Sequence, residues 1–419
     1  MKNLHNLPPE LKRNLLNLFA AGLLFWLSLS SLLPTLPLYI ESLGATKQQI
    51  GIVMGSFAVG MLIFRSQLGV LADNRGRKIV LLIGMISLAI APIGYLLVTS
   101  LSLLPLLMVI RAFHGISLAA FGTGFVALVA DLAPEQRRGE MIGFMSLINP
   151  IGVAIGPALG GYLQASIGNT ALFTTSSLLA GLGVLCLLPV VNPPILEQPP
   201  KQEGSGFLQT LISSRVFIPA VILLTIGLTL GTVHAFIGLY IKETGVNLNA
   251  GLFFTAAAIA SFSVRLFAGH ASDKYGRGLF ITLSLFAYTI SMIMIWQAQS
   301  ELMFLLGGIL EGAGSGAAIP MMSTIMTDRA WPHERGRIFG IALTGFDVGI
   351  FIAGPIFGAI AEQIGYRGMF IVNIALTFTA IVIFATFSGK TVSKSFRFAF
   401  GFGEDAYALK QQELKSLNG

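Results

Sequence analysis

Long apolar stretches alternate with short polar segments along nearly the whole chain. A helix needs about 20 apolar residues to cross the hydrocarbon core of a bilayer. Twelve stretches reach that length, at residues 15–40, 50–72, 79–99, 104–130, 141–165, 170–191, 216–241, 249–271, 278–299, 302–327, 337–361 and 366–388. They lack the strict alternation of a membrane β-barrel. We therefore expect an all-α membrane protein with twelve transmembrane helices, the first of which is too long for a signal-peptide core.

The composition agrees with a chain that lies mostly in lipid. Hydrophobic residues make up 54% of the 419 positions and charged residues only 11%, whereas a soluble domain is about 25% charged. The net charge of +7 would suit nucleic acid only if it formed one basic face on a soluble domain, so we expect no such partner. The single cysteine, Cys186, excludes an intramolecular disulfide and a multi-cysteine metal site.

The distribution of the 26 basic residues predicts the orientation of the chain. If the N-terminus is cytoplasmic, twenty of them fall in the termini and inner loops, three in outer loops and three inside spans. Lys and Arg concentrate on the cytoplasmic side of membrane proteins. Both termini are therefore expected to be cytoplasmic, in an inner or plasma membrane. The three basic residues inside spans are Arg65, Arg111 and Arg265.

The longest break between apolar stretches divides them six and six. It contains four prolines and then Gly204-Ser205-Gly206, a composition that cannot continue a helix. The predicted organisation is a cytoplasmic segment at 1–14, a six-helix bundle at 15–191, a cytoplasmic linker at 192–215, a second six-helix bundle at 216–388 and a cytoplasmic tail at 389–419. We expect part of this polar, basic tail to be disordered. Its phenylalanines at 396, 398, 400 and 402 leave contact with the membrane surface open.

The two halves of the chain repeat each other. The segment from Gly69 to Arg77 (GVLADNRGR) corresponds to that from Gly269 to Arg277 (GHASDKYGR), an offset of 200 (277 − 77). Further pairs follow at offsets of 197 or 198: Gly115 with Gly312, Asp131 with Asp328, Arg138 with Arg335, and Gly156-Pro157 with Gly354-Pro355. Parallel six-span repeats are the architecture of one large transporter class, whose substrate site lies near the midplane between the repeats.

These motifs resemble those of the Major Facilitator Superfamily, over nearly all of residues 15–388. Three motifs carry the resemblance: the loop after the second span (69–78), the fourth-span motif RAFHG (111–115) and the fifth-span motif of exporters, GVAIGPALGG (152–161). The resemblance implies two pseudo-symmetric six-helix bundles, and the nearest group is the twelve-span drug and metabolite:proton antiporters, including the sugar-efflux-permease-like proteins. Two positions depart from it, because Ser117 and Ile350 stand where glycines are usual.

Each position of the loop motif has a physical role. Gly69 would let two helices approach closely, Gly76 can adopt the positive φ of a tight turn, and Asp73 can accept hydrogen bonds at a helix end. The basic pair that follows would anchor the loop at the lipid headgroups. The resemblance implies a lock on one cytoplasmic-closed arrangement, with Asp73 and Asp273 latching the halves together; a well-formed turn is the alternative. The whole set is Arg65, Gly69, Asp73, Gly76, Arg77 and Lys78, echoed by Arg265, Gly269, Asp273, Gly276 and Arg277.

The fifth-span motif predicts a small-residue groove. Gly152, Gly156 and Gly160 are four residues apart and therefore lie along one face of a helix. Pro157 removes a backbone donor and permits a bend. With Gly161 they would allow tight packing against a neighbouring span. The resemblance favours export, and the alternative is the generic small-residue packing of membrane helices.

Three charged residues lie deep inside predicted spans. Asp347, Glu311 and Arg111 are about 15, 14 and 10 Å from a span end at 1.5 Å per residue. Each costs roughly 2.5–3.5 kcal/mol at mid-membrane, so such charges are expected to be paired or to face a cavity. A buried carboxyl can hold a proton at neutral pH. Asp347 and Glu311 are therefore candidates for coupling, with Arg111 tuning one of them or binding an anionic substrate group; a structural ion pair is the alternative.

Four further residues complete the candidate pathway. Asn149 occupies the repeat position of Asp347 (347 − 198 = 149). The two halves therefore differ here, and only one of them carries an acid, as expected if coupling uses a single proton site. His114 and His234 could titrate near neutral pH, although a lone buried histidine is more often hydrogen-bonded packing. Glu41, at the outer end of the first span, is either a gate residue or a solvated helix end.

These features indicate a secondary active transporter that exports a small organic compound, such as a drug, sugar or metabolite, in exchange for protons by alternating access. We expect a monomer in the lipid bilayer, driven by a proton gradient, with no cofactor, no metal and no catalytic residues, and therefore not an enzyme. No Gly-x-x-x-x-Gly-Lys-Ser/Thr nucleotide motif occurs. The alternatives are a proton-coupled importer and, in another class, a non-transporting receptor or scaffold, or a lipid flippase, on the same fold.

Overall fold

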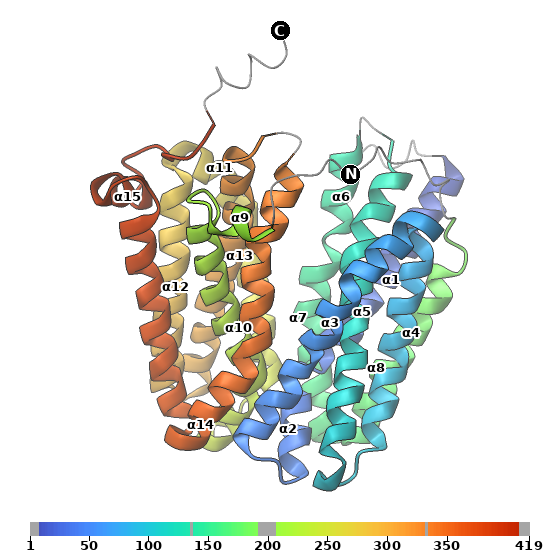
Figure 1. Ribbon diagram of the computed structural model, residues 1–419. Coiled ribbons are helices and arrows are strands. Elements are labelled where there is room, and N and C mark those ends of the chain that lie inside the picture. Colours follow the sequence, from blue (N-terminus) through green and yellow to red (C-terminus); the bar gives the residue numbers. More distant parts are fainter. Residues whose placement is uncertain (1–7, 135–136, 192–206, 332–333, 410–419) are drawn as a thin grey trace. The chain divides into compact units, whose positions relative to one another are not determined.

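The computed structural model describes residues 8–134, 137–191, 207–331 and 334–409, and within these ranges all regular structure is helical (Figure 1). The contacts divide the chain into two compact units. The first comprises Met1–Pro200 with Ile237–Ile241 and Leu248–Thr255, and the second comprises Lys201–Phe236, Lys242–Asn247 and Ala256–Gly419. Most of the predicted linker, at 192–206, lies outside the described residues.

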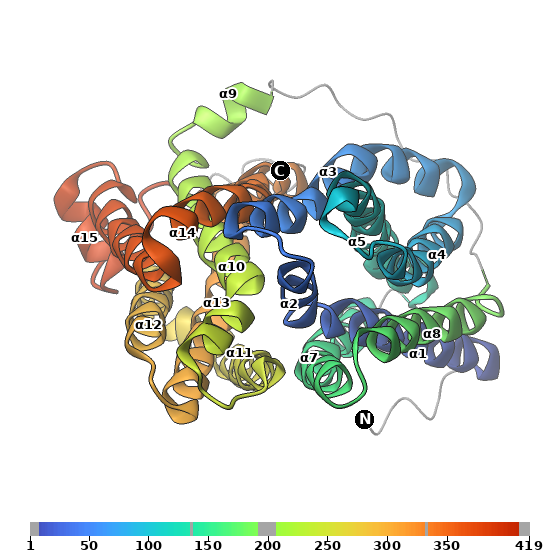
Figure 2. The same ribbon diagram turned by 90° about the horizontal axis from the view of Figure 1, so that it is seen from below.

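The first unit is built from the helices that precede the linker. They are α1 (Pro9–Ser31), α2 (Thr35–Ser42), α3 (Lys47–Arg75), α4 (Arg77–Leu96), the 3₁₀ turn η2 (Leu101–Leu103), α5 (Leu104–Leu132), α6 (Arg138–Met145), α7 (Ile148–Ser166) and α8 (Asn169–Leu187). In this unit α5 packs between α3 and α4, while α1 packs on α7 and α8 (Figure 2). The long apolar runs thus bury one face against neighbouring helices.

The second unit follows the same plan. Its helices are α9 (Phe207–Ile212), α10 (Phe217–Thr244), α11 (Ala250–Tyr275), α12 (Arg277–Gln297), α13 (Glu301–Asp328), α14 (Arg335–Phe387) and α15 (Val392–Ala399). Helix α12 packs on both α13 and α14. The C-terminal end of α10 and the N-terminal end of α11 contribute the two short segments that group with the first unit.

Helix boundaries follow local chemistry. Thr46 and Gln49 form a reciprocal capping box at the start of α3, which satisfies backbone donors that would otherwise lack partners. Gly76 separates α3 from α4 at φ 91° and Gly276 separates α11 from α12 at φ 93°. The positive φ expected of Gly76 is therefore confirmed, and its echo adopts the same turn.

Eleven helical stretches in the described chain are long and apolar enough to cross a membrane. The last of them contains two predicted spans, because α14 runs through Gly365, whose φ of 75° and ψ of 170° break the helix. Two predicted spans are not single helices. The stretch 15–40 divides into α1 and α2 after Ser31, and the stretch 141–165 divides into α6 and α7 after Met145. The high mean hydropathy of these stretches hides both breaks, although Pro34 and Pro150 lie a few residues beyond them and proline disfavours a continuous helix.

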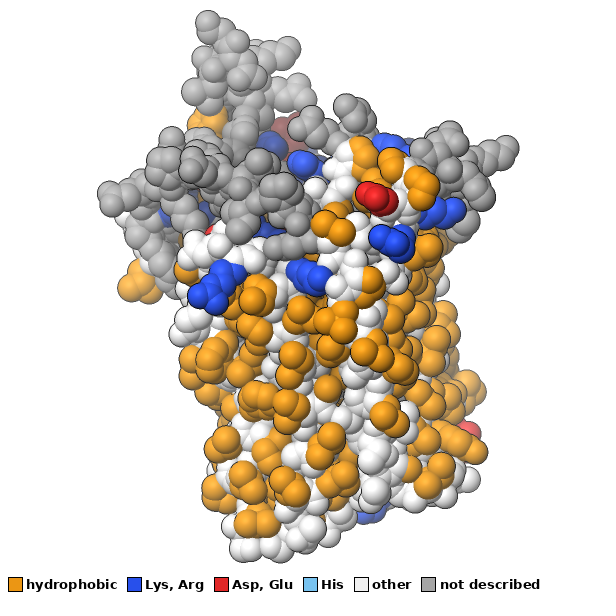
Figure 3. Space-filling model, turned by 90° about the vertical axis from the view of Figure 1, so that its right-hand side faces the viewer, with side chains coloured by type: hydrophobic (Ala, Val, Ile, Leu, Met, Phe, Trp, Pro, Cys, Tyr) orange, Lys and Arg blue, Asp and Glu red, His pale blue; other side chains and the backbone are white. Residues whose placement is uncertain are grey.

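The outer surface is apolar, as a membrane requires. Figure 3 shows hydrophobic side chains along most of the height of one face, with Lys and Arg gathered mainly towards one end. Exposed side chains include Ile90 at 51%, Leu182 at 51% and Leu185 at 60%. Because so much apolar surface would be unfavourable in water, these faces are suited to contact lipid.

The segment after Ser388 is folded where it is described. Helix α15 begins at Val392 with Thr391 as its N-cap, and Phe398 and Ala399 are buried at 5% and 0% exposure. Residues 389–409 are therefore ordered. Residues 410–419 lie outside the described chain, so the expectation that part of the tail is disordered stays a prediction. Phe398 fills space beside Phe384 of α14, a contact that a polar composition cannot reveal.

Candidate functional site

The fourth-span motif places a buried cation beside a buried histidine. Arg111 on α5 is 6% exposed and His114, one turn later, is fully buried. The Nη1 atom of Arg111 lies 3.3 Å from His114 Nδ1, and the Tyr95 hydroxyl lies 2.8 Å from the same nitrogen. The guanidinium also covers the Phe57 ring at 4.5 Å. Arg111 thus gains a cation–π contact but no carboxylate partner among the described residues.

Close helix packing fixes this centre. A Cβ added to Gly115 would collide with the backbone carbonyl of Phe57 on α3, and one added to Gly60 would collide with that of Ala112. Glycine at both positions lets α3 and α5 touch backbone to backbone. The adjacent His114 and Arg111 are therefore held deep between helices, and Arg111 Nε and His114 Nε2 have no hydrogen-bond partner among the described residues.

The second unit places a buried carboxyl at the equivalent position. Glu311 on α13 is 5% exposed and its repeat position is that of His114 (311 − 197 = 114). Its neighbour Gly312 packs against the backbone of Ala257 on α11, as Gly115 packs on α3. Glu311 Oε1 is buried and has no hydrogen-bond partner in the described chain. A buried polar atom without a hydrogen-bond partner has lost its hydrogen bonds to water and gained none from the protein, which is energetically unfavourable.

Sequence reasoning missed the polar neighbours of these two groups. Tyr95 is fully buried against His114. Tyr288 on α12 is 1% exposed and packs against Gly314, three residues after Glu311. Neither tyrosine belongs to a motif, so only the fold identifies them. Asn373 on α14 is a further buried polar residue, and neither atom of its side-chain amide has a hydrogen-bond partner in the described chain.

The remaining candidates of the predicted pathway are spread over four helices. Asp347 on α14, Asn149 at the start of α7, His234 on α10 and Glu41 near the end of α2 are all half-buried. The side chains of Asp347, His234 and Glu41 have interaction partners. Their roles in transport remain predictions. Arg65 and Arg265 are exposed on α3 and α11, where long basic side chains can reach the membrane surface.

The first loop motif forms an ion cluster inside its own unit. Arg77 Nη1 lies 2.5 Å from Asp73 Oδ1 and its Nε lies 3.6 Å from Asp131 at the end of α5. The Arg77 side chain is only 17% exposed, so it joins three helix ends instead of anchoring the loop at headgroups. Lys78 Nζ donates to the carbonyl of Leu188, beyond the end of α8.

Gly69 differs from its expected role. No heavy atom of the described residues lies within 4 Å of a Cβ built on Gly69 or on its echo Gly269. The close approach expected there occurs instead at Gly60 and Gly115, nearer the middle of the helices. The latch between the halves through Asp73 and Asp273 remains a prediction, since each aspartate pairs with the arginine of its own motif.

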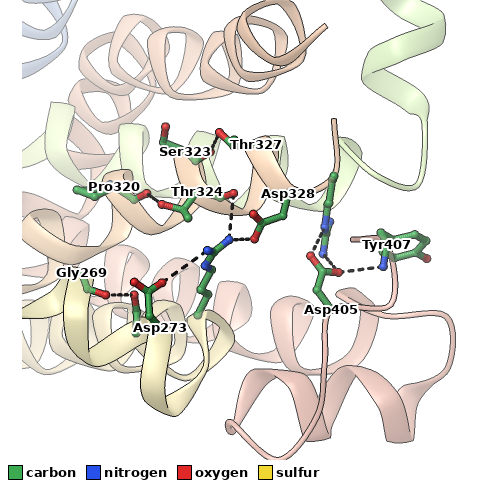
Figure 4. Close-up of polar contacts among 12 residues, drawn as sticks. Gly269, Asp273, Pro320, Ser323, Thr324, Thr327, Asp328, Asp405 and Tyr407 are labelled. Atoms are coloured by element: carbon green, nitrogen blue, oxygen red, sulfur yellow. Dashed lines mark hydrogen bonds and ion pairs between the residues drawn. The ribbon is translucent and has the colours of Figure 1, made fainter. Parts of the chain in front are cut away.

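The second loop motif repeats the cluster. Arg277 pairs with Asp328 and lies 3.6 Å from Asp273, and its Nη1 also donates to the Thr324 carbonyl (Figure 4). Asp131 and Asp328 were recognised as a repeated pair, but their partnership with Arg77 and Arg277 was not anticipated. Both aspartates stand near the ends of α5 and α13, where a cation at the start of the preceding helix can reach them.

A second ion pair, absent from the predictions, ties the tail to this cluster. Arg329 is 1% exposed and donates to both oxygens of Asp405, at 2.7 and 2.9 Å. It also donates to the carbonyls of Arg215 and Ser388 and covers the Tyr407 ring at 5.1 Å. The Leu409 amide donates to the Asp328 carbonyl. Figure 4 shows Asp405 and Tyr407 beside Asp328.

The fifth-span glycines form the predicted groove. Gly152 packs against Trp26, Gly156 against Leu27 and Ser30, and Gly160 against Ser31. Ser30 Oγ donates to the Gly152 carbonyl at 3.0 Å, which strengthens the seam between α1 and α7. Pro157 lies inside α7, and Gly161 faces the side chain of Asn249, a residue of the same unit.

The second unit compensates for Ile350. A Cβ added to Gly231 on α10 would approach the backbone of Ile350, and one added to Gly227 would collide with the Phe346 carbonyl. Glycines on the partner helix α10 thus provide the close approach at Ile350. Gly345 and Gly349 of α14 supply further close contacts with α10. The sequence departure at 350 therefore preserves close packing of the two helices.

Comparison with known proteins places this geometry in a family. Residues 18–276 and 245–410 match the Major Facilitator Superfamily. The chain is 27% identical over 351 residues to the quinolone resistance protein NorA of Staphylococcus aureus, covering 81% of this chain and 87% of NorA. It is 25% identical over 358 residues to the multi-drug resistance efflux pump PmrA of Streptococcus pneumoniae, covering 82% and 88%.

Solved structures share the fold at low sequence identity. The nucleoside transporter NupG superposes with a TM-score of 0.72 at 17% identity, covering 88% of this chain and 99% of that one. A bacterial homologue of the human lysosomal transporter Spinster superposes with a TM-score of 0.74 at 14% identity, covering 90% and 96%. The all-helical, two-unit membrane fold predicted from the sequence is thereby confirmed.

Proposed function

The chain belongs to the Major Facilitator Superfamily and is a multi-pass membrane transporter, and from this premise we propose that it exports small organic compounds in exchange for protons. Its relatives NorA and PmrA are named as drug-resistance and efflux proteins, which favours a drug-like substrate and the outward direction. Alternating access between the two units would carry the substrate. The basic residues favour a cell membrane location with both termini in the cytoplasm.

Glu311 is the observation that carries the coupling proposal. Its carboxyl is 5% exposed, and Oε1 has no hydrogen-bond partner in the described chain. A low-dielectric site disfavours a charged carboxyl, so the Glu311 carboxyl needs either a bound proton or a cationic group of the substrate. If the proton and the substrate alternate on this carboxyl, proton entry is linked to substrate exit. Asp347, half-buried on α14, is the second candidate for this role.

Arg111 contributes a fixed positive charge to the first unit. Its side chain is 6% exposed and its Nε has no hydrogen-bond partner among the described residues. We assign Arg111 to tuning a coupling carboxyl or to binding an anionic substrate group. The proton gradient is the energy source, so the proposal includes no cofactor, and the transporter acts as a monomer.

The test uses the purified chain in liposomes with an imposed pH gradient. A panel of quinolones, other drugs, sugars and amino acids is screened for substrate-dependent proton movement, and the wild type is expected to respond to at least one drug. Glu311→Gln should lose the proton-driven part of transport by at least about tenfold, a barrier change of about 1.4 kcal/mol. Glu301→Gln is the control, since Glu301 is an exposed acid in the first turn of the same helix.

Two results would contradict the proposal. Undiminished pH-driven transport by Glu311→Gln would exclude Glu311 as the coupling group, and Asp347→Asn would then be measured in the same assay. Direction is tested separately, with intact cells and everted vesicles. Efflux predicts substrate accumulation in everted vesicles whose lumen has been acidified, because protons leaving the lumen exchange for substrate entering it. The symport alternative predicts accumulation in intact cells.

A further inference from the structure

Helix α15 presents three distinct faces, one of which is buried against the rest of the second unit. Ser395, Phe398 and Ala399 are buried. Thr282 of α12 donates a hydrogen bond of 2.7 Å to the Ala399 carbonyl, and Gly278 packs against the Phe398 carbonyl. Figure 1 shows α15 beside the ends of α12 and α14, turned away from their direction. These contacts hold the helix firmly against the second unit.

The second face is apolar and exposed. Val392 is 62% exposed and Phe396 is 54% exposed, and Phe400 follows at the same spacing of four, which places the three on one stripe. The Phe396 and Phe400 rings contact each other in a tilted arrangement, with centroids 4.5 Å apart. Phe402, just beyond the helix, is 73% exposed. Large exposed apolar patches of this kind mark a contact with another surface.

The third face is basic. Lys394 and Arg397 are exposed and lie three residues apart, on a stripe away from the phenylalanines. Arg397 Nη2 donates to the Phe402 carbonyl at 3.2 Å, and both side chains line a pocket with Asp273 and Glu404, but neither forms an ion pair with a carboxylate of the described residues. Lys390, four residues before Lys394, is exposed as well. An apolar stripe flanked by basic residues on a short helix is the pattern of helices that lie in the membrane interface.

The apolar stripe also continues the lipid-facing surface of the bundle. Phe378, Val382 and Phe387 on the outer side of α14 are exposed at 56%, 45% and 59%. Only four residues separate Phe387 from Val392. An apolar surface that is already suited to hydrocarbon thus passes directly into α15, at the end of the helices that carries the basic loop motif.

We propose that α15 is an interfacial helix that binds the anionic phospholipids of the leaflet next to it, which is the cytoplasmic leaflet in the orientation given above. Val392, Phe396 and Phe402 enter the acyl boundary, while Lys394 and Arg397 meet the headgroup phosphates. Each basic residue near an anionic surface contributes about fivefold in binding. Because the buried face rests on α12 beside Arg277, the bound lipid stabilises the end of the second unit.

The first experiment measures the depth of α15 and does not depend on transport. The chain carries Cys186→Ser and either Phe396→Cys or Lys394→Cys, is spin-labelled, and is reconstituted in vesicles of phosphatidylcholine with about 30% phosphatidylglycerol. The label at 396 should be more accessible to oxygen than to a water-soluble nickel complex, and the label at 394 should show the reverse. Equal access to nickel at both sites, or protection from both reagents by a protein partner or a second copy, would overturn the proposal.

The second experiment tests the lipid charge. Phosphatidylglycerol should raise the thermal unfolding temperature of the wild type above its value in phosphatidylcholine alone, and Lys394→Gln/Arg397→Gln should lose at least half of that shift. Lys12→Gln/Arg13→Gln is the matched control, because it removes two exposed cations at the start of α1. An equal response of wild type and both double variants, or an equal loss in both double variants, would contradict specific binding at α15.

Discussion

The two units keep the same helix crossing but carry different chemistry on it. In the first, Gly115 presses α5 against the backbone of Phe57; in the second, Gly312 presses α13 against the backbone of Ala257. The residue before the glycine is His114 in one unit and Glu311 in the other. Close packing therefore requires glycine in both copies. The preceding position is buried in both units but carries a base in the first and an acid in the second.

The loop clusters differ in a second way. Arg77 and Arg277 each meet two aspartates within their own unit. Only the second cluster is joined by the tail, through Arg329 and Asp405. The repeat position of Arg329 is Leu132 (329 − 197), so the first half has no charge to bury there. The second unit consequently needs the tail, a segment that lies outside the repeat, to neutralise its buried arginine.

The largest expected loss of stability comes from removing the acidic partner of Arg329. Asp405→Asn would leave the Arg329 guanidinium, 1% exposed, without its counter-charge, and breaking a buried pair in this way costs about 3 kcal/mol or more. Thermal unfolding in detergent measures the loss. Glu404→Gln is the control, because the neighbouring Glu404 is exposed and its replacement should change stability by less than about 0.5 kcal/mol. Equal effects of the two variants would show that the pair does not stabilise the unit.

The helix crossing that both units share predicts smaller losses of stability, of similar size in the two units. Gly115→Ala and Gly312→Ala would each force two backbones apart, at about 1–3 kcal/mol. Thermal unfolding should detect both. Gly122→Ala on α5 is the control, because no heavy atom of the described residues lies within 4 Å of its added Cβ, and alanine is the better helix former. A destabilised Gly122→Ala, or an unaffected Gly312→Ala, would break the equivalence of the two crossings.

Substitution of His114 and of Glu311, which occupy equivalent positions, should have different consequences for transport. His114→Gln would lose the contact of Nδ1 with Tyr95 and Arg111 and should lower stability by about 1 kcal/mol. It should retain pH-driven transport, in contrast to Glu311→Gln. Proton flux in liposomes and thermal unfolding, measured on both variants, separate the two roles. Loss of proton coupling in His114→Gln would place coupling in the first unit instead.

The smallest effects are expected at the ion clusters themselves. The Asp131 and Asp328 side chains are 45% and 37% exposed, and solvent screens pairs of this kind, so each Asp→Asn substitution should cost about 0.5 kcal/mol. The losses should shrink further in high salt. Stability measured at low and high ionic strength checks this. A loss above about 2 kcal/mol in either variant would mean that the cluster is more strongly coupled than its exposure indicates.

The sequence predicted what depends on regular patterns. Hydropathy located the membrane-spanning stretches, and the offset repeat identified the paired motifs and the fold. Hydropathy alone did not locate the breaks after Ser31 and Met145, because it does not weigh the prolines at 34 and 150 that follow them. Nor could the sequence predict that Gly69 has no close neighbour among the described residues or that Gly231 lies opposite Ile350, since these depend on which helix faces which.

The candidate site was predicted only in part. Arg111, His114 and Glu311 were recognisable as charged or titratable groups within apolar runs. Their uncharged neighbours Tyr95 and Tyr288 were not, because an aromatic residue in a membrane helix is ordinary. The pair of Arg329 and Asp405 is separated by 76 residues and crosses from the bundle to the tail. No local pattern marks such a pair, and only the folded chain brings it together.

The order of Arg329 and Asp405 along the chain also has a consequence for biogenesis. A protein is synthesised from its N-terminus, and its domains fold in that order. The ribosome therefore adds Arg329 to the growing second bundle 76 residues before its acidic partner. Until Asp405 emerges, the bundle holds an uncompensated cation where the folded protein excludes water. A nascent chain that stops between the two residues keeps this defect.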